Sequence, residues 1–242
     1  FFGGWEGVRE RVNYGGLYTV PTADQRNGDF SAYNATIYDP ATGNPDGTGR
    51  TPFANRMIPA SRQSSVARKF QEWIPLPNQP GLNANYFNSA TQVLDRDNFD
   101  AKINWNRNSK HSIFGKYSAM TALHVGEFAL GQAGGDCLCA GGVGRGQTLV
   151  QLASIGHTYT FSPTLLWDGT LSWNRIGSRH ESQDFGTNYG SEVLGIPGTN
   201  GPDYRQSGLP DFLVSGYSTL GNRNPWWPYF WNDTNYSTTQ NF

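Results

Sequence analysis

The stretch HTYTFSPTLLWDGTLSWNR, residues 157–175, alternates large apolar with small polar side chains after a Ser-Pro turn. Successive side chains of an extended strand point to opposite faces, so Trp167, Leu171 and Trp173 share one face. The other face carries Asp168, Thr170, Ser172 and Asn174. The pattern suits a soluble sandwich, where the aromatic face packs on a second sheet, and also an outer-membrane barrel, where that face contacts lipid.

A second stretch, DNFDAKINWN at residues 97–106, repeats the alternation. Phe99, Ile103 and Trp105 lie on one face, opposite Asp100, Lys102 and Asn104. The segment then meets the turn NRNSKH and returns as SIFGKYSAM. Two alternating runs joined by a short polar turn predict a β-hairpin.

Composition narrows the class of protein without settling its relation to the membrane. The chain has 242 residues, 14% aromatic and 15% charged, where soluble domains average roughly 25% charged residues. No apolar run approaches the ~18 to 20 residues of a membrane-spanning helix, whereas a barrel strand needs only about 10 alternating residues. A membrane helix bundle is excluded, and the mean hydropathy of -0.58 does not exclude a barrel.

Charge and cysteine content argue against several kinds of site. The formal net charge is -1, from 18 basic and 19 acidic side chains, so we expect no nucleic-acid partner. Cys137 and Cys139 are the only cysteines, which excludes a multi-disulfide framework and a four-thiolate zinc site. A local disulfide and a free pair both fit their spacing. The sequence predicts no metal, no cofactor and no catalytic residues, and therefore not an enzyme.

The spacing of the expected strands is asymmetric. We predict strands near 1–20, 98–107, 111–120, 148–161, 165–176 and 235–242, with long loops at 23–97, 119–147 and 176–234. Connections in compact domains run about 4 to 6 residues, whereas outer-membrane barrels combine short periplasmic turns with long extracellular loops. The predicted fold is all-β: a partial antiparallel transmembrane barrel, forming a curved open sheet of about five or six strands.

One short helix is expected inside the first loop. SRQSSVARKFQEWI, residues 61–74, places Val66, Phe70 and Trp73 or Ile74 at helical spacing after Ser61, a plausible N-cap. Pro75 ends the pattern. We expect the apolar stripe of this helix to pack within the loop.

Nine collinear motifs carry a family resemblance. They are VPT with R.GDFS (20–31), IYDPATG (37–43), RTPF (50–53), MIPASR (57–62), PLPN (75–78), DNFDAKINWN (97–106), SIFGKYS (112–118), GHTYTFSPTLLWDGTLSWNR (156–175) and LGIPG (194–198). In this order they resemble TonB-dependent outer-membrane receptors of the Oar-like, carboxypeptidase-regulatory-like type. The resemblance implies a plugged barrel of about twenty-two strands, of which this chain is the N-terminal part after the plug.

The resemblance also implies a function and a location. It places the chain in the bacterial outer membrane, where such receptors take up a large or scarce nutrient, such as a ferric chelate or an oligosaccharide. The implied partners are outer-membrane lipid, the plug and remaining strands of the receptor, TonB through the missing upstream part, and a nutrient of unknown identity.

The residues predict three sets of functional positions. The lumen-facing set is Asp100, Lys102, Asn104, Asp168, Thr170, Ser172 and Asn174. The lipid-facing set is Phe99, Ile103, Trp105, Trp167, Leu171 and Trp173. A possible ligand-contact loop, NPWWPYFW at 224–231, offers Trp226, Trp227, Tyr229 and Trp231 as a platform for a sugar ring or flat ligand. An interfacial aromatic girdle or plain loop packing is the simpler explanation of this cluster.

The alternative class is a soluble secreted β-sandwich that binds carbohydrate through exposed tryptophans. That protein would fold alone in water and cover its aromatic face with a second sheet. A barrel segment would instead leave its sheet edges open. The arrangement of Trp167 and Trp173 therefore decides between the two classes.

Overall fold

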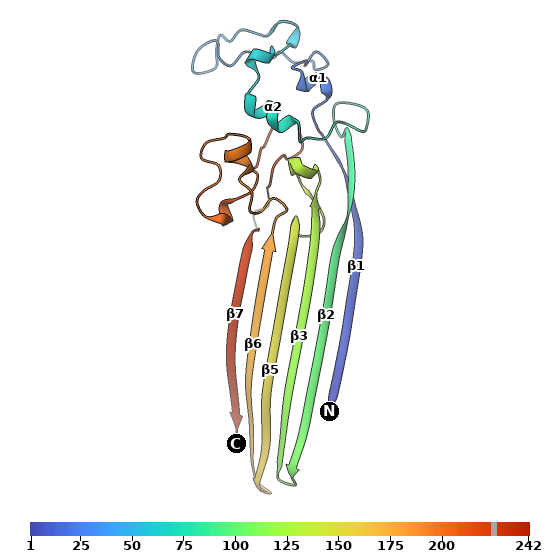
Figure 1. Ribbon diagram of the computed structural model, residues 1–242, viewed down its shortest axis with the longest axis vertical. Helices are drawn as coiled ribbons and strands as arrows, with labels where there is room; N and C mark the ends of the chain where they lie inside the picture. The colour runs from blue at the N-terminus through green and yellow to red at the C-terminus, as the bar shows by residue number, and fades with distance from the viewer. Residues whose placement is uncertain (224–226) are drawn as a thin grey trace.

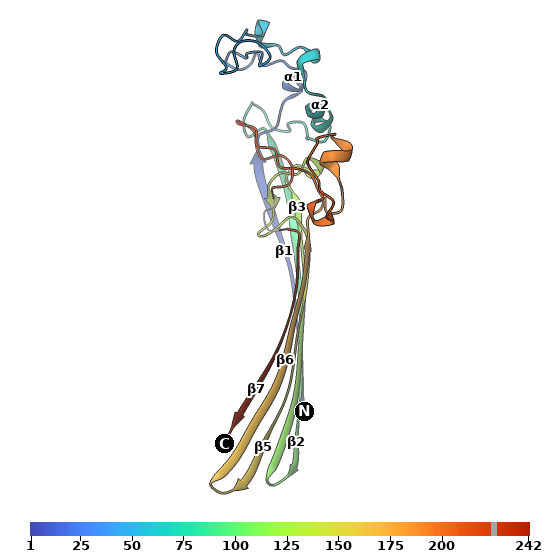
Figure 2. The ribbon, with the colours of Figure 1, turned by 90° about the vertical axis from the view of Figure 1, so that its left-hand side faces the viewer.

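The computed structural model describes residues 1–223 and 227–242 of the chain. All strands in these residues belong to one antiparallel sheet, in the order β1-β2-β3-β5-β6-β7, with the short β4 paired to β3 (Figure 1). The strands are β1 Phe2–Tyr18, β2 Tyr86–Asn108, β3 His111–Phe128, β4 Cys137–Leu138, β5 Gly144–Ser162, β6 Leu165–Glu181 and β7 Tyr229–Asn241. Seen from the side, the sheet is a single layer (Figure 2).

The strands are much longer than those of ordinary soluble sheets. β2 has 23 residues, β5 has 19 and even β7 has 13, whereas strands in globular proteins usually have about 5 or 6. A membrane-crossing strand needs about 9 to 11 residues. Each long strand can therefore cross a bilayer and continue beyond it. None of the helices in the described residues has the length and hydrophobicity that a bilayer span requires.

The connections at the two ends of the sheet differ as the sequence predicts. Only two residues separate β2 from β3, and two separate β5 from β6. At the opposite end the chain makes long excursions, 19–85, 129–143 and, in the described residues, 182–223 with 227–228, that gather above the sheet (Figure 1). These excursions are called the crown below.

The expected strand bounds were too short on the crown side. β2 begins at Tyr86 rather than near 98, β3 continues to Phe128 rather than 120, and β7 begins at Tyr229 rather than 235. Segment 86–97 mixes polar with apolar side chains on both faces, so its sequence gives no strand signal, yet it pairs residue by residue with β1. An apolar alternation marks a strand only where one face is dry, and these extensions have polar groups on both faces.

The helices of the crown are short. α1 spans Ala23–Arg26 and α2 spans Ser65–Gln71, beside one-turn segments at Ala54–Arg56, Ala60–Arg62, Gly131–Ala133, Tyr189–Val193 and Tyr204–Gln206. The prediction that Ser61 is the N-cap is wrong, because Ser61 lies in the one-turn segment before α2. Ser64 caps the helix by accepting a hydrogen bond from the Ala67 amide. Ser64 is the better placed of the two because its backbone is extended immediately before the first helical residue. α1 was not predicted, because four residues carry no periodic signal.

The three excursions of the crown share one hydrophobic core. Its buried members are Val20, Phe70, Ile74, Ala129, Leu130, Ala133, Leu138, Leu194, Leu209 and Leu220. Phe70 and Ile74 come from α2 and the residues after it, so the prediction that the helix stripe packs within the loop is confirmed. Arg26 ties α1 to the end of α2 by donating hydrogen bonds to the carbonyl oxygens of Gln71 (2.9 Å) and Pro75 (2.6 Å). Cys137 and Cys139 form a disulfide in the second excursion.

Candidate functional site

The strand register assigns every sheet residue to one of two faces. Directly paired residues of antiparallel strands point the same way, and Ile103 pairs with Gly115, Gly115 with Ile155, and Ile155 with Leu171. The next row across the sheet consists of residues one position away. In it Lys102 pairs with Lys116, Lys116 with Ser154, and Ser154 with Ser172. The two predicted sets thus lie on opposite faces, called the apolar face and the polar face below. Which face meets lipid stays a prediction at this point.

The apolar face is organised in layers along the strands. Nearest the hairpin turns lie the aromatic side chains of Trp105, Tyr159 and Trp167, and farther up lie those of Trp5, Phe99, Trp173 and Tyr236. Between these two aromatic girdles the face is aliphatic, with Ile103, Ile155 and Leu171 in one row across the sheet. Trp167 and Trp173 are six residues apart, roughly 20 Å along a strand, which suits a barrel's apolar band of about 25 Å.

Nothing in the described residues covers this apolar surface. Ile103 is 64% exposed, Leu171 is 56% exposed, and Trp167 and Trp173 are partly exposed. The indole of Trp167 contacts only its own face, edge-on to His157 at 4.2 Å between ring centroids and stacked on Phe242 at 5.9 Å. Soluble monomers rarely expose so wide an apolar patch, so the structure does not support the soluble sandwich.

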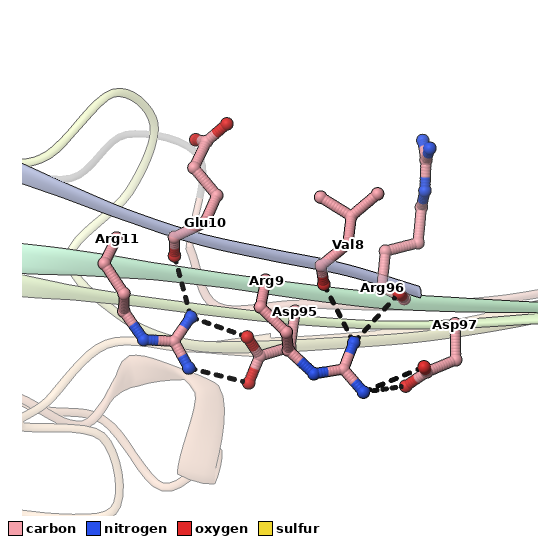
Figure 3. Close-up of polar contacts among 7 residues, drawn as sticks. All are labelled: Val8, Arg9, Glu10, Arg11, Asp95, Arg96 and Asp97. Atoms are coloured by element: carbon pink, nitrogen blue, oxygen red, sulfur yellow. Dashed lines mark hydrogen bonds and ion pairs between the residues drawn. The ribbon is translucent and has the colours of Figure 1, made fainter. Parts of the chain in front are cut away.

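A charged belt begins immediately above the upper girdle, on the same face. It contains Arg9, Arg11, Asp95 and Asp97 from β1 and β2 (Figure 3). One guanidinium nitrogen of Arg9 donates to both carboxylate oxygens of Asp97 at 2.8 Å, and Arg11 donates to the two oxygens of Asp95 at 2.6 and 3.1 Å.

The belt also bonds to the backbone. The second terminal nitrogen of Arg9 donates to the carbonyl oxygens of Val8 (2.8 Å) and Arg96 (3.1 Å). Charged groups on a lipid-facing surface are costly at the bilayer centre and cheap near its interface. On the predicted assignment of the apolar face to lipid, the belt therefore lies at the level where hydrocarbon ends.

The belt gives a first prediction. Asp97→Asn should lower the free energy of unfolding by less than about 1 kcal/mol, because exposed ion pairs contribute little and the two side chains are 50% and 23% exposed. Denaturant titration of the complete receptor that contains this segment, folded into lipid vesicles, would measure the change. The effect should shrink further at high salt. A loss of several kcal/mol would show that the pair lies inside hydrocarbon, against the layer assignment above.

A cluster of histidine and aromatic side chains lies on the polar face, at the end nearest the crown. His124 of β3, His180 of β6, and the aromatic residues Trp227 and Tyr229 line a cavity of about 450 Å³. The rings of His180 and Tyr229 stack at 4.3 Å, and Trp227 meets the edges of His180 and His124 at 5.0 and 5.7 Å. This cluster can receive a ring, but Trp227 and Tyr229 also pack the loop against the strands.

The predicted ligand-contact loop is thus only partly brought together. Trp227 and Tyr229 both contact the ring of His180, whereas Trp231 lies farther along the polar face and is 59% exposed. Trp226 lies outside the described residues. Sequence reasoning missed the meeting of the two histidines, because they belong to different strands, β3 and β6, that are far apart in the sequence. Gly146 pairs with both His124 and His180, and a Cβ there would meet the His180 ring at 2.3 Å, a constraint that only the register reveals.

The described residues bring together no group of three or more His, Cys, Asp or Glu side chains able to hold a metal ion.

Comparison with known families agrees with this geometry. A family model described as Outer membrane beta barrel domain matches residues 1–242, which include every strand and all three excursions of the crown. No curated protein and no solved structure matches the chain. The full-length match and the single sheet with one apolar and one polar face lead to the same conclusion. The chain belongs to the outer membrane beta barrel domain family and is a protein of the bacterial outer membrane.

Proposed function

We propose that the chain is part of the barrel of a TonB-dependent receptor of the Oar-like type, which imports a large or scarce nutrient such as a ferric chelate or an oligosaccharide. The observation that carries the membrane part of this proposal is the aliphatic row between two aromatic girdles, with polar side chains directly behind it. The nine collinear motifs support the receptor type.

The polar face suits a water-filled lumen. Behind the aliphatic row, Lys116 lies 3.8 Å from Asp100, Ser118 donates a hydrogen bond to the same carboxylate, and the Lys102 ammonium lies 4.9 Å from the centre of the Phe114 ring. Charges at this depth need water or partners, because hydrocarbon offers neither. A barrel with a polar interior provides both.

The crown leans over the same face. The amide of Ala140 donates to the side-chain oxygen of Gln92 at 2.6 Å, and a Cβ on Gly126 would meet Cys139 Sγ at 2.6 Å. Gln92 and Gly126 both belong to the polar face by register. The second excursion therefore covers the loop end of the polar face, as an extracellular loop does when it bends over a barrel mouth. This arrangement supports capture of the nutrient outside and passage along the polar face.

Both edges of the sheet need partners. β1 and β7 are its outermost strands, and within the described residues neither has a strand on its outer side. An open edge inside a bilayer leaves backbone groups unpaired at a cost of several kcal/mol each. We propose that further strands of the same receptor close the barrel, that a plug fills it, and that TonB acts through the part upstream of this segment.

Uptake by whole cells tests the proposal. Cells that carry the complete receptor containing this segment should accumulate labelled ferric chelates or oligosaccharides in a strain with TonB, and accumulation should fall to the background of receptor-free cells when TonB is deleted. Equal accumulation with and without TonB would refute energised transport. Because the chain's membership of the barrel family does not depend on transport, such a result would leave the fold conclusion intact.

A further inference from the structure

The crown contains an apolar cavity that is separate from the polar face of the sheet. It has a volume of about 350 Å³ and lies between α2 and the segment 212–220, in the part of the crown near α1. Its walls include the aromatic rings of Phe30, Phe70 and Phe212, of which the last two lie 4.7 Å apart. Phe70 is buried in the core of the crown, so this wall is fixed by the fold.

Neutral polar groups interrupt the apolar walls. Gln25, which is buried, is held by two contacts: its side-chain oxygen accepts a hydrogen bond from the Thr22 amide at 2.8 Å, and its side-chain nitrogen donates to the Tyr33 hydroxyl. Burial, and secondarily the neighbouring Tyr33, raise the pKa of Tyr217 to about 12, so its phenol stays neutral at physiological pH. No Asp, Glu, Lys, Arg or His lines the cavity among the described residues. A charged guest would lose its hydration without gaining an ionic partner.

The size of the cavity limits the guest. An apolar protein cavity of about 150 Å³ binds benzene, and this one is a little more than twice that volume. Aromatic walls favour offset or edge-on contacts with a second ring system. The Tyr217 hydroxyl and the Gln25 amide offer a hydrogen bond to a polar substituent on the guest.

We propose that this cavity is a binding site for a neutral aromatic group of one or two rings that carries a hydroxyl or carbonyl substituent. The guest can be a free molecule or the aromatic part of a larger one. The inference goes beyond the proposed transport function, because binding requires only the folded crown. It can hold even if uptake proves independent of TonB.

The test uses the complete receptor that contains this segment, in lipid nanodiscs, with 2-naphthol as the probe and the signal of empty nanodiscs subtracted. Fluorescence titration should show saturable binding at one site per chain. Naphthalene-2-sulfonate, which has the same rings and a fixed negative charge, should bind at least tenfold more weakly. A signal that rises linearly without saturation, or equal affinity for the two probes, would overturn the proposal.

Two variants locate the site. Val214 lines the cavity and is 49% exposed, so Val214→Trp should fill the opening without disturbing the core. Leu213→Trp is its matched control, because Leu213 is 66% exposed and is not part of the lining. We expect at least tenfold weaker 2-naphthol binding for Val214→Trp and a change of less than twofold for Leu213→Trp.

A second variant that fills the cavity shows whether weaker binding comes from the filled cavity or from misfolding. Ala67 lines the opposite wall on α2 and is exposed, so Ala67→Leu should also weaken binding while preserving the helix, since leucine is a strong helix former. Circular dichroism should show unchanged secondary structure in all three variants. Unchanged affinity in both Val214→Trp and Ala67→Leu would place the probe elsewhere and refute the site.

Discussion

Leu171→Arg should lower the free energy of unfolding by about 2 to 4 kcal/mol, the cost of a cation on the lipid face near the bilayer midplane. Leu171 lies in the aliphatic row between the two aromatic girdles, is 56% exposed and pairs with Ile155. An arginine there would have to stay in hydrocarbon or bend toward a distant interface. Its neighbour Ser172 lies on the polar face, so Ser172→Arg should cost much less, since a lumen position is wet.

Both variants can be measured by denaturant titration of the complete receptor after folding into lipid vesicles of defined thickness. The comparison is well matched, because the substitutions introduce the same residue at adjacent positions of one strand. In thinner bilayers the cost of Leu171→Arg should fall, since the interface moves closer. Equal costs for the two substitutions would mean that neither face is specifically lipid-exposed, and the assignment of the apolar face would have to be abandoned.

The spanning part of the sheet could be predicted from the sequence because the bilayer imposes a strict rule. One face of each strand must be apolar and the other polar, so the alternation at 97–106 and 165–175 fixes which residues share a face. The register bears this out, since Ile103 and Leu171 lie in one row and Lys102 and Ser172 in the next. Both hairpin turns could also be predicted, because each is a short polar break between two such runs.

The crown and the crown-side ends of the strands could not be predicted in the same way. Where both faces of a strand carry polar groups, as in 86–97, no periodicity separates strand from loop, and only pairing with β1 reveals it. The core of the crown joins residues far apart in the chain, such as Val20, Phe70 and Leu220. The meeting of His124 with His180 depends on a register across three strands. These are tertiary contacts, which a local pattern does not encode.

Asn85→Leu should destabilise the crown by about 2 to 6 kcal/mol, because it leaves two buried backbone groups unpaired at ~1 to 3 kcal/mol each. Asn85 and Val20 are both 0% exposed. The side-chain oxygen of Asn85 accepts from the Val20 amide at 2.9 Å, and its side-chain nitrogen donates to the Val20 carbonyl at 2.9 Å. The Asn85 side-chain amide thus pairs both backbone groups of Val20, as a neighbouring strand would, just after β1 ends. Leucine has a similar size but cannot form these hydrogen bonds.

The effect should be confined to the crown. Hydrogen exchange of the complete receptor in vesicles should show faster exchange around residues 19–22 and 78–86, while amides near Leu171 keep their protection. Asn83→Leu is the control: Asn83 is exposed two positions away, and surface substitutions usually change stability by less than about 0.5 kcal/mol. If Asn85→Leu also released the spanning strands, the crown and the sheet would form one cooperative unit. If instead it left crown exchange unchanged, the Asn85–Val20 pair would not hold the start of the first excursion in place.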